Sequence, residues 1–172
     1  RARERNPVKI DPAEFGTYVH AVLEECGRAV VEMGGFQNVS LEKTLEIAAD
    51  ASSRYFAKRF AQMNTERLSY HFHKNAREVQ FVVRELWEEL QDSQFQPVHF
   101  ELGFGDDKRM PAVDISGKTM DAQLGGYVDR VDKWDNAGKE YIRVVDYKTG
   151  KKDFDYCDVF NGIGLQMLLY MF

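Results

Sequence analysis

Apolar residues recur at helical spacing through the first half of the chain. Three segments repeat an apolar residue every three or four positions, the period of an amphipathic helix. They cover residues 11 to about 33, 40 to about 63, and about 65 to 91. Asp11 and Ser40 stand where a helix N-cap is expected, and Gly34 with Gly35 stops the first segment. The pattern therefore predicts three helices.

The second half changes to the period-two alternation of β-strands after Gln96 and Pro97. Strand-like runs cover residues 98–105, 119–134 and 140–149. The sequence DNAG at 135–138 predicts a hairpin turn in which Gly138 can take a positive φ. From residue 158 the spacing becomes helical again. The predicted order is three helices, three strands and a final helix, an α/β protein.

Length and composition bound the class of protein. At 172 residues with 44% apolar and 30% charged residues, the chain is expected to form one globular domain. The predicted division is a helical part over 1–95 and a part over 96–172 that carries the sheet, the final helix and the site. The net charge of −5 argues against a surface that binds nucleic acid all over, but not against a local metal site. The absent initial methionine and the apolar end predict a fragment.

The chain shows no sign of a membrane or secretory segment. It has no uncharged apolar run long enough to span a bilayer and no signal-peptide pattern. Cys26 and Cys157 are too few for a disulfide framework, which indicates a reducing compartment and a cytoplasmic location. No P-loop motif is present, so this segment is not expected to bind ATP.

The strongest chemical pattern lies in the strand-like runs. Asp129 is followed seventeen residues later by Asp146, and Lys148 lies two further on. Alternating side chains put Asp146 and Lys148 on one face, and a hairpin partner can place Asp129 beside them. Carboxylates that converge near a lysine suit Mg²⁺ or Mn²⁺ and a phosphate substrate. An ion pair on a solvated strand is the commoner explanation of an isolated DxK.

Four ordered motifs favour the chemical interpretation over the ion pair. They are GTYVH at 16–20, GYVDRVD at 126–132, VVDYKTGKK at 144–152 and GLQMLLY at 164–170. In this order the chain resembles the RecB-like exonuclease branch of the PD-(D/E)xK nuclease superfamily, in particular the AddB (RexB) type of nuclease domain. The resemblance implies a restriction-endonuclease-like α/β core, a central mixed sheet flanked by helices, with a helical N-terminal region.

The resemblance also implies roles for individual residues. It implies that His20, Asp129, Asp146 and the backbone carbonyl of Tyr147 bind the catalytic metal, and that Lys148 is the catalytic lysine. Gln166 and Tyr170 match the QxxxY motif that helps to position DNA. The remaining candidates are Glu101, as an acid near the metal, and Lys151, as a phosphate contact. Without the motifs, His20 would more often be a core histidine and Lys151 a solvated turn residue.

The implied function is a Mg²⁺- or Mn²⁺-dependent DNA exonuclease module of a bacterial helicase-nuclease. Its implied partners are DNA and an AddA-type subunit, and its implied role is the repair of double-strand breaks by recombination. The iron–sulfur cluster of AddB-type domains is expected only in a longer protein, because neither Cys26 nor Cys157 matches a cluster position. The alternatives are a catalytically silent nuclease-fold module that binds DNA or a partner, and a helical interaction protein with little β-structure.

Overall fold

The computed structural model describes residues 12–59, 66–105, 108–117 and 119–148, with the side chains of 66–73 omitted. The chain divides between Ser93 and Gln94 into two compact units. The described part of the first unit is helical, and that of the second consists of strands and connections. These two parts are the helical unit and the sheet unit.

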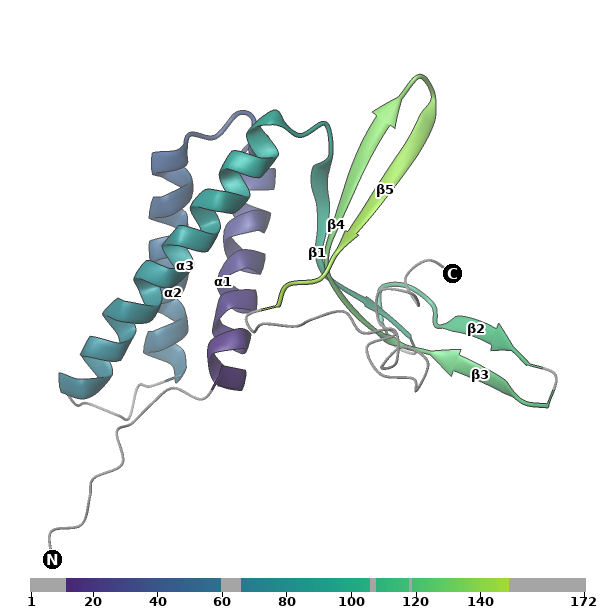
Figure 1. Ribbon diagram of the computed structural model, residues 1–172, viewed down its shortest axis with the longest axis horizontal. Coiled ribbons are helices and arrows are strands. Elements are labelled where there is room, and N and C mark those ends of the chain that lie inside the picture. The colour runs from purple at the N-terminus through teal and green to yellow at the C-terminus, as the bar shows by residue number, and fades with distance from the viewer. Residues whose placement is uncertain (1–11, 60–65, 106–107, 118, 149–172) are drawn as a thin grey trace, which may run out of the picture. The chain divides into compact units, whose positions relative to one another are not determined.

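Three helices form the helical unit at the predicted places. They are α1 (Pro12–Glu32), α2 (Leu41–Arg59) and α3 (Glu66–Asp92), drawn from purple to teal in Figure 1. α1 ends where Gly34 and Gly35 take φ values of 107° and 91°, and the Gly35 amide donates to the Val30 carbonyl at 2.9 Å. The Ser40 hydroxyl caps α2 by accepting from the Lys43 amide at 3.2 Å. Asp11 lies outside the described residues.

The core of the helical unit forms where α1 packs against α2 and α2 packs against α3. Its fully buried side chains come from all three helices and the connection between α1 and α2: Tyr18, Val22, Leu23, Val30, Phe36, Ala48, Val79, Val83 and Leu90. Two of the polar side chains in this core have hydrogen-bond partners. The Tyr18 hydroxyl lies 3.0 Å from the Ser52 hydroxyl oxygen, and the Trp87 indole donates to the Val39 carbonyl at 2.8 Å. These pairs let bulky polar side chains add to an apolar core.

Cys26 is a core thiol of α1, 2% exposed, and its sulfur lies 3.6 Å from the Thr44 carbonyl oxygen. Burial raises its pKa from about 9 to about 12. In the unfolded chain the thiol ionises above about pH 9, whereas in the folded chain it stays protonated. Stability is therefore complete below pH 9 and falls as the pH rises toward 12, by up to about 1.4 kcal/mol per pH unit.

This difference predicts alkaline destabilisation that depends on Cys26. In a chain with Cys157→Ser, urea unfolding at pH 8, 9 and 10 should show a falling free energy of unfolding. The further change Cys26→Ala should flatten that fall, even though it also removes a packed side chain and lowers stability at every pH. An equal fall in both chains would contradict the assignment.

The sheet unit contains a three-stranded and a two-stranded antiparallel sheet. β1 (Gln96–Phe104), β4 (Gly126–Asn136) and β5 (Lys139–Val145) form the first, in the order β1-β4-β5, and β2 (Val113–Ser116) pairs with β3 (Asp121–Leu124) in the second (Figure 1). The α/β class is confirmed. Every strand pair among the described residues is antiparallel, so the mixed character of the sheet stays a prediction. The predicted final helix, from residue 158, lies outside the described residues.

The hairpin turn between β4 and β5 is confirmed. Ala137 and Gly138 are its two central residues, with φ values of 49° and 78°, and Asn136 pairs with Lys139. Two consecutive positive φ values suit the twist of a two-residue hairpin. This turn fixes the register of β5 against β4 as far as the pair Arg130 and Val145.

Two strand predictions were wrong. The run 119–134, expected to be one strand, is β3 and β4, which belong to different sheets. The break falls at Gly125, where a Cβ atom would lie only 3.2 Å from the carbonyl oxygen of Phe104. β2 was missed because its four residues hold only Val113 and Ile115 as apolar members, too short a run for a periodic signal.

Candidate active site

The strand register places three acidic residues side by side across the larger sheet. Val145 pairs with Arg130, so Asp146, one residue beyond β5, comes next to Asp129. On the other side of β4, Glu101 lies opposite Asp129, because the flanking pairs are Phe100 with Arg130 and Leu102 with Val128. Glu101, Asp129 and Asp146 are called the acid row below.

A bulge in β1 determines that Glu101 belongs to this row. The register is Pro97 opposite Asp132 before the bulge and His99 opposite Val131 after it, so Val98 is an extra residue. Without it Glu101 would lie opposite Val128 and its side chain would point to the other face. The bulge therefore places the Glu101 side chain on the same face of the sheet as Asp129.

Glu101 and Asp129 form a like-charge pair. Their carboxylates offer oxygen atoms within 4.8 Å of each other, and Asp129 is only 7% exposed. Like charges directly opposite one another on neighbouring strands are destabilising. Glu101 also has a φ of 48°, which is unfavourable for a residue with a side chain. Such an arrangement suits a divalent cation, which prefers oxygen ligands and would offset the repulsion.

Asp146, Tyr147 and Lys148 form the DYK segment, whose lysine adds an amine to the acid row. The Lys148 ammonium lies 2.6 Å from a carboxylate oxygen of Asp146, whose side chain is 7% exposed. The Lys148 side chain is 44% exposed, so its charge is partly open to solvent. The two side chains share a side as predicted, although Asp146, Tyr147 and Lys148 follow β5 rather than lie within it.

The backbone of Tyr147 meets Asp129 directly. Its amide donates to a carboxylate oxygen of Asp129 at 2.5 Å. A hydrogen bond to a carboxylate stabilises the charged form and fixes its orientation. Asp129 is thus held from the DYK side, which joins the two acidic motifs.

A buried cluster of charges, absent from the sequence predictions, lies on the other face of β4. The side chains of Arg130 and Asp132 are 2% and 0% exposed, and Arg130 Nε lies 2.8 Å from Asp132 Oδ1. Arg143 Nη2 lies 2.7 Å from Asp132 Oδ2. Arg130 also donates to the Tyr147 hydroxyl at 3.3 Å. Burial raises the pKa of Tyr147 to about 12, so this hydroxyl stays neutral.

The remaining sequence candidates are His20, Lys151, Gln166 and Tyr170. His20 is a half-buried residue of α1, in the helical unit, and its role as a metal ligand stays a prediction. Lys151, Gln166 and Tyr170 lie outside the described residues.

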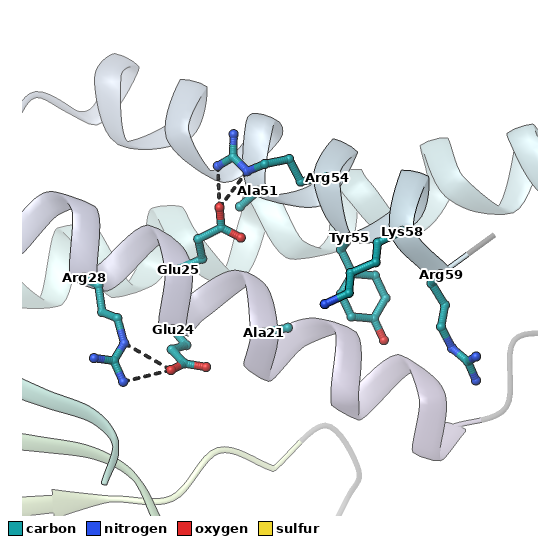
Figure 2. A pocket seen from close by; sticks show the side chains of 9 residues that line it. All are labelled: Ala21, Glu24, Glu25, Arg28, Ala51, Arg54, Tyr55, Lys58 and Arg59. Atoms are coloured by element: carbon teal, nitrogen blue, oxygen red, sulfur yellow. Dashed lines mark hydrogen bonds and ion pairs between the residues drawn. The ribbon is translucent and has the colours of Figure 1, made fainter. Parts of the chain in front are cut away.

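The helical unit has an open groove of about 640 Å³ between α1 and α2. Figure 2 shows its lining: Ala21, Glu24, Glu25, Arg28, Ala51, Arg54, Tyr55, Lys58 and Arg59. Arg28 pairs with Glu24 at 2.8 Å, and Arg54 pairs with Glu25 at 2.5 Å. Each of the two acids in this lining is thus paired with an arginine, which leaves no pair of carboxylates of the kind that a divalent cation requires. The acid row therefore remains the better candidate for metal-dependent chemistry.

None of the helices in the described residues is long and apolar enough to cross a membrane.

The chain is similar to known proteins whose names include a deoxyribonuclease. The chain is 34% identical over 179 residues to an ATP-dependent helicase/deoxyribonuclease subunit of Clostridium novyi, covering 99% of this chain and 15% of that protein. It is 33% identical over 196 residues to the protein of the same name from Acetivibrio thermocellus, and 28% identical over 178 residues to that from Pediococcus pentosaceus, with the same coverage. The chain thus spans about 15% of the length of these relatives.

The family model of the PD-(D/E)XK nuclease superfamily matches residues 1–172. The motifs that carry the acid row and the DYK lysine are thus part of a match that covers the whole chain. The predicted resemblance is confirmed, and the chain belongs to the PD-(D/E)XK nuclease superfamily.

Proposed function

We propose that the chain is a metal-dependent deoxyribonuclease module that hydrolyses the phosphodiester bonds of DNA. The observation that carries the proposal is the convergence of Glu101 and Asp129 beside the ion pair of Asp146 and Lys148. Membership in a nuclease superfamily and relatives named as deoxyribonuclease subunits support it. Both units are proposed to act as one module, with the helical unit contributing His20.

The donor set fits Mg²⁺ or Mn²⁺. Asp129 and Asp146 would supply carboxylate oxygens, and the Tyr147 carbonyl would supply another oxygen. Glu101, whose carboxylate offers an oxygen within 4.8 Å of one of Asp129, would add one more. His20 is proposed to complete the set with a ring nitrogen. When bound, a divalent cation lowers the pKa of a water molecule and neutralises phosphate charge.

Lys148 is proposed as the catalytic lysine. Its partly exposed ammonium is held by Asp146 within reach of a phosphate in solvent. An ammonium there would orient the attacking water and stabilise the negative charge that develops on the phosphate oxygens. Gln166, Tyr170 and Lys151 are proposed to position the DNA strand. Contacts of this kind go to the backbone and carry no sequence information.

The names of the relatives support a proposal for the biological setting. They are subunits of a helicase/deoxyribonuclease, so we propose an AddA-type helicase-nuclease subunit as the partner of the protein that carries this chain. The module would act as an exonuclease on DNA ends during double-strand break repair and recombination. A bacterial enzyme with that substrate works in the cytoplasm. The proposed iron–sulfur cluster belongs to parts of such proteins beyond this chain.

A silent module that binds DNA without cutting it is the second candidate. The strained backbone of Glu101 and its repulsion with Asp129 argue against it, because a purely binding surface does not require them.

The test is digestion of linear DNA with Mg²⁺ by the wild-type chain and by Asp146→Ala, purified identically. The substitution removes a proposed ligand and the partner of Lys148, so we expect a rate loss of at least about a hundredfold. Addition of EDTA should stop the wild-type reaction. Circular dichroism checks that both chains are folded alike. Equal rates in both chains would indicate a contaminating nuclease, and no cleavage by either would favour the silent module.

A further inference from the structure

Beside the acid row lies an exposed aromatic ring with a lysine over it. Tyr127 is the second residue of β4, 55% exposed, and the Lys108 ammonium lies 4.0 Å from the centre of its ring. The same ammonium lies 3.4 Å from the Gly126 carbonyl oxygen. Tyr127 and Lys108 are called the stacking platform below.

Alternation along β4 puts Tyr127 on the face that carries Asp129. The two residues are two positions apart, which corresponds to about 7 Å along a strand. On the neighbouring strand β1, Gly103 pairs with Tyr127, and Glu101 lies opposite Asp129. The platform therefore occupies the next same-face position after the acid row.

A missing side chain makes room for the platform. A Cβ atom at Gly103 would lie 3.0 Å from Cε1 of Tyr127 and 3.1 Å from Cδ of Lys108. Both side chains thus lie across the bare backbone of β1. Backbone hydrogen bonds hold Lys108 near the end of β1: its amide donates to the Gly105 carbonyl at 3.2 Å. The Gly105 amide donates to the Met110 carbonyl at 2.9 Å, and the Met110 amide donates to the Gly103 carbonyl at 3.2 Å.

An exposed ring that carries a cation is the combination with which proteins hold single-stranded nucleic acid. Bases stack on aromatic side chains whatever their identity, and a nearby lysine attracts the backbone phosphate. A duplex gains little from such a ring, because its bases are already stacked on each other.

We propose that Tyr127 and Lys108 bind one unpaired nucleotide of a DNA strand next to the acid row. The base stacks on Tyr127 and the phosphate contacts Lys108. This inference rests on the proposed function, which it deepens by naming two residues that hold the DNA strand beside the acid row.

Binding of a fluorescent oligothymidylate by fluorescence polarisation tests the platform. The background is the 172-residue chain with Asp146→Ala, so that binding is measured without cleavage. Tyr127→Ala should weaken binding about tenfold, which corresponds to about 1.4 kcal/mol, while Tyr127→Phe, which keeps the ring, should stay within about twofold. Tyr141→Ala is the matched control, because Tyr141 is 41% exposed and lies in the hairpin away from the acid row.

Lys108→Ala should lower the slope of log affinity against log salt by about 0.7, the value for one phosphate contact on a single strand. The melting temperature of each variant shows that it is folded. The platform is overturned if Tyr127→Ala binds the oligothymidylate as tightly as the background chain, or if Tyr141→Ala loses as much affinity as Tyr127→Ala. It is also overturned if Tyr127→Ala weakens binding of a blunt duplex equally, or if the background chain does not bind the oligothymidylate.

The two proposals fail separately. If wild-type chain cuts DNA and Tyr127→Ala binds normally, only the platform is wrong. If the Tyr127 effect is found but wild-type chain cuts nothing, the platform stands and the hydrolytic function is wrong.

Discussion

Asp129→Asn is expected to remove nearly all DNA cleavage while leaving the metal-free chain at least as stable as wild type. Asparagine keeps an oxygen that can accept from the Tyr147 amide, so the local backbone is retained. It removes one of two facing negative charges, which relieves the repulsion with Glu101. The activity loss should exceed about a hundredfold, because a neutral amide is a weak ligand for a hard cation.

Two measurements separate the effects of Asp129→Asn. Thermal unfolding in EDTA gives the stability of the metal-free chain, and the same measurement with Mn²⁺ should raise the melting temperature of wild type but not of the variant. Asp135→Asn is the control, since Asp135 is an exposed acid on the same strand. A variant that loses activity together with several kcal/mol of metal-free stability would contradict this account of the acid row.

Asp132→Ala is expected to lower the free energy of unfolding by about 3–5 kcal/mol. Asp132 is fully buried and pairs with both Arg130 and Arg143, so its removal leaves the buried Arg130 guanidinium without its carboxylate partner. Removing one member of a buried charge pair has this cost because the remaining charge stays out of water. Urea unfolding by circular dichroism measures it.

The control for Asp132→Ala is Asp114→Ala, an exposed acid of β2 whose partner is the Gln123 amide at 3.0 Å. Its loss should change stability by less than about 0.5 kcal/mol. Equal effects of the two substitutions would contradict the role of the buried charges. Loss of Asp132 should also weaken activity, since Arg130 contacts Tyr147, which contacts Asp129.

The helices and the β4–β5 turn were predictable because local chemistry specifies them. Two glycines can adopt the positive φ values that end α1, Ser40 can cap α2, and Gly138 can close a two-residue turn. The pairing of Asp146 with Lys148 was predictable for a similar reason, because residues two apart on an extended chain share a side.

The position of Glu101 and the burial of the charged residues of β4 depend on contacts between distant segments, which the sequence pattern does not reveal. The position of Glu101 opposite Asp129 depends on the single extra residue Val98, which no periodicity reveals. Burial of Arg130 and Asp132 was not predictable either, since charged residues are seldom buried unless a partner such as Arg143 comes from another strand. The motif GYVDRVD therefore holds one acid for the site and one for the interior.

Glu101 shows where durability and chemistry conflict in this chain. Its left-handed backbone angle is one that glycine adopts without penalty, so Glu101→Gly would relax both the main chain and the electrostatic crowding. That exchange would also erase a carboxylate from the site. Glu101 thus marks a position that thermostabilising library approaches should leave fixed.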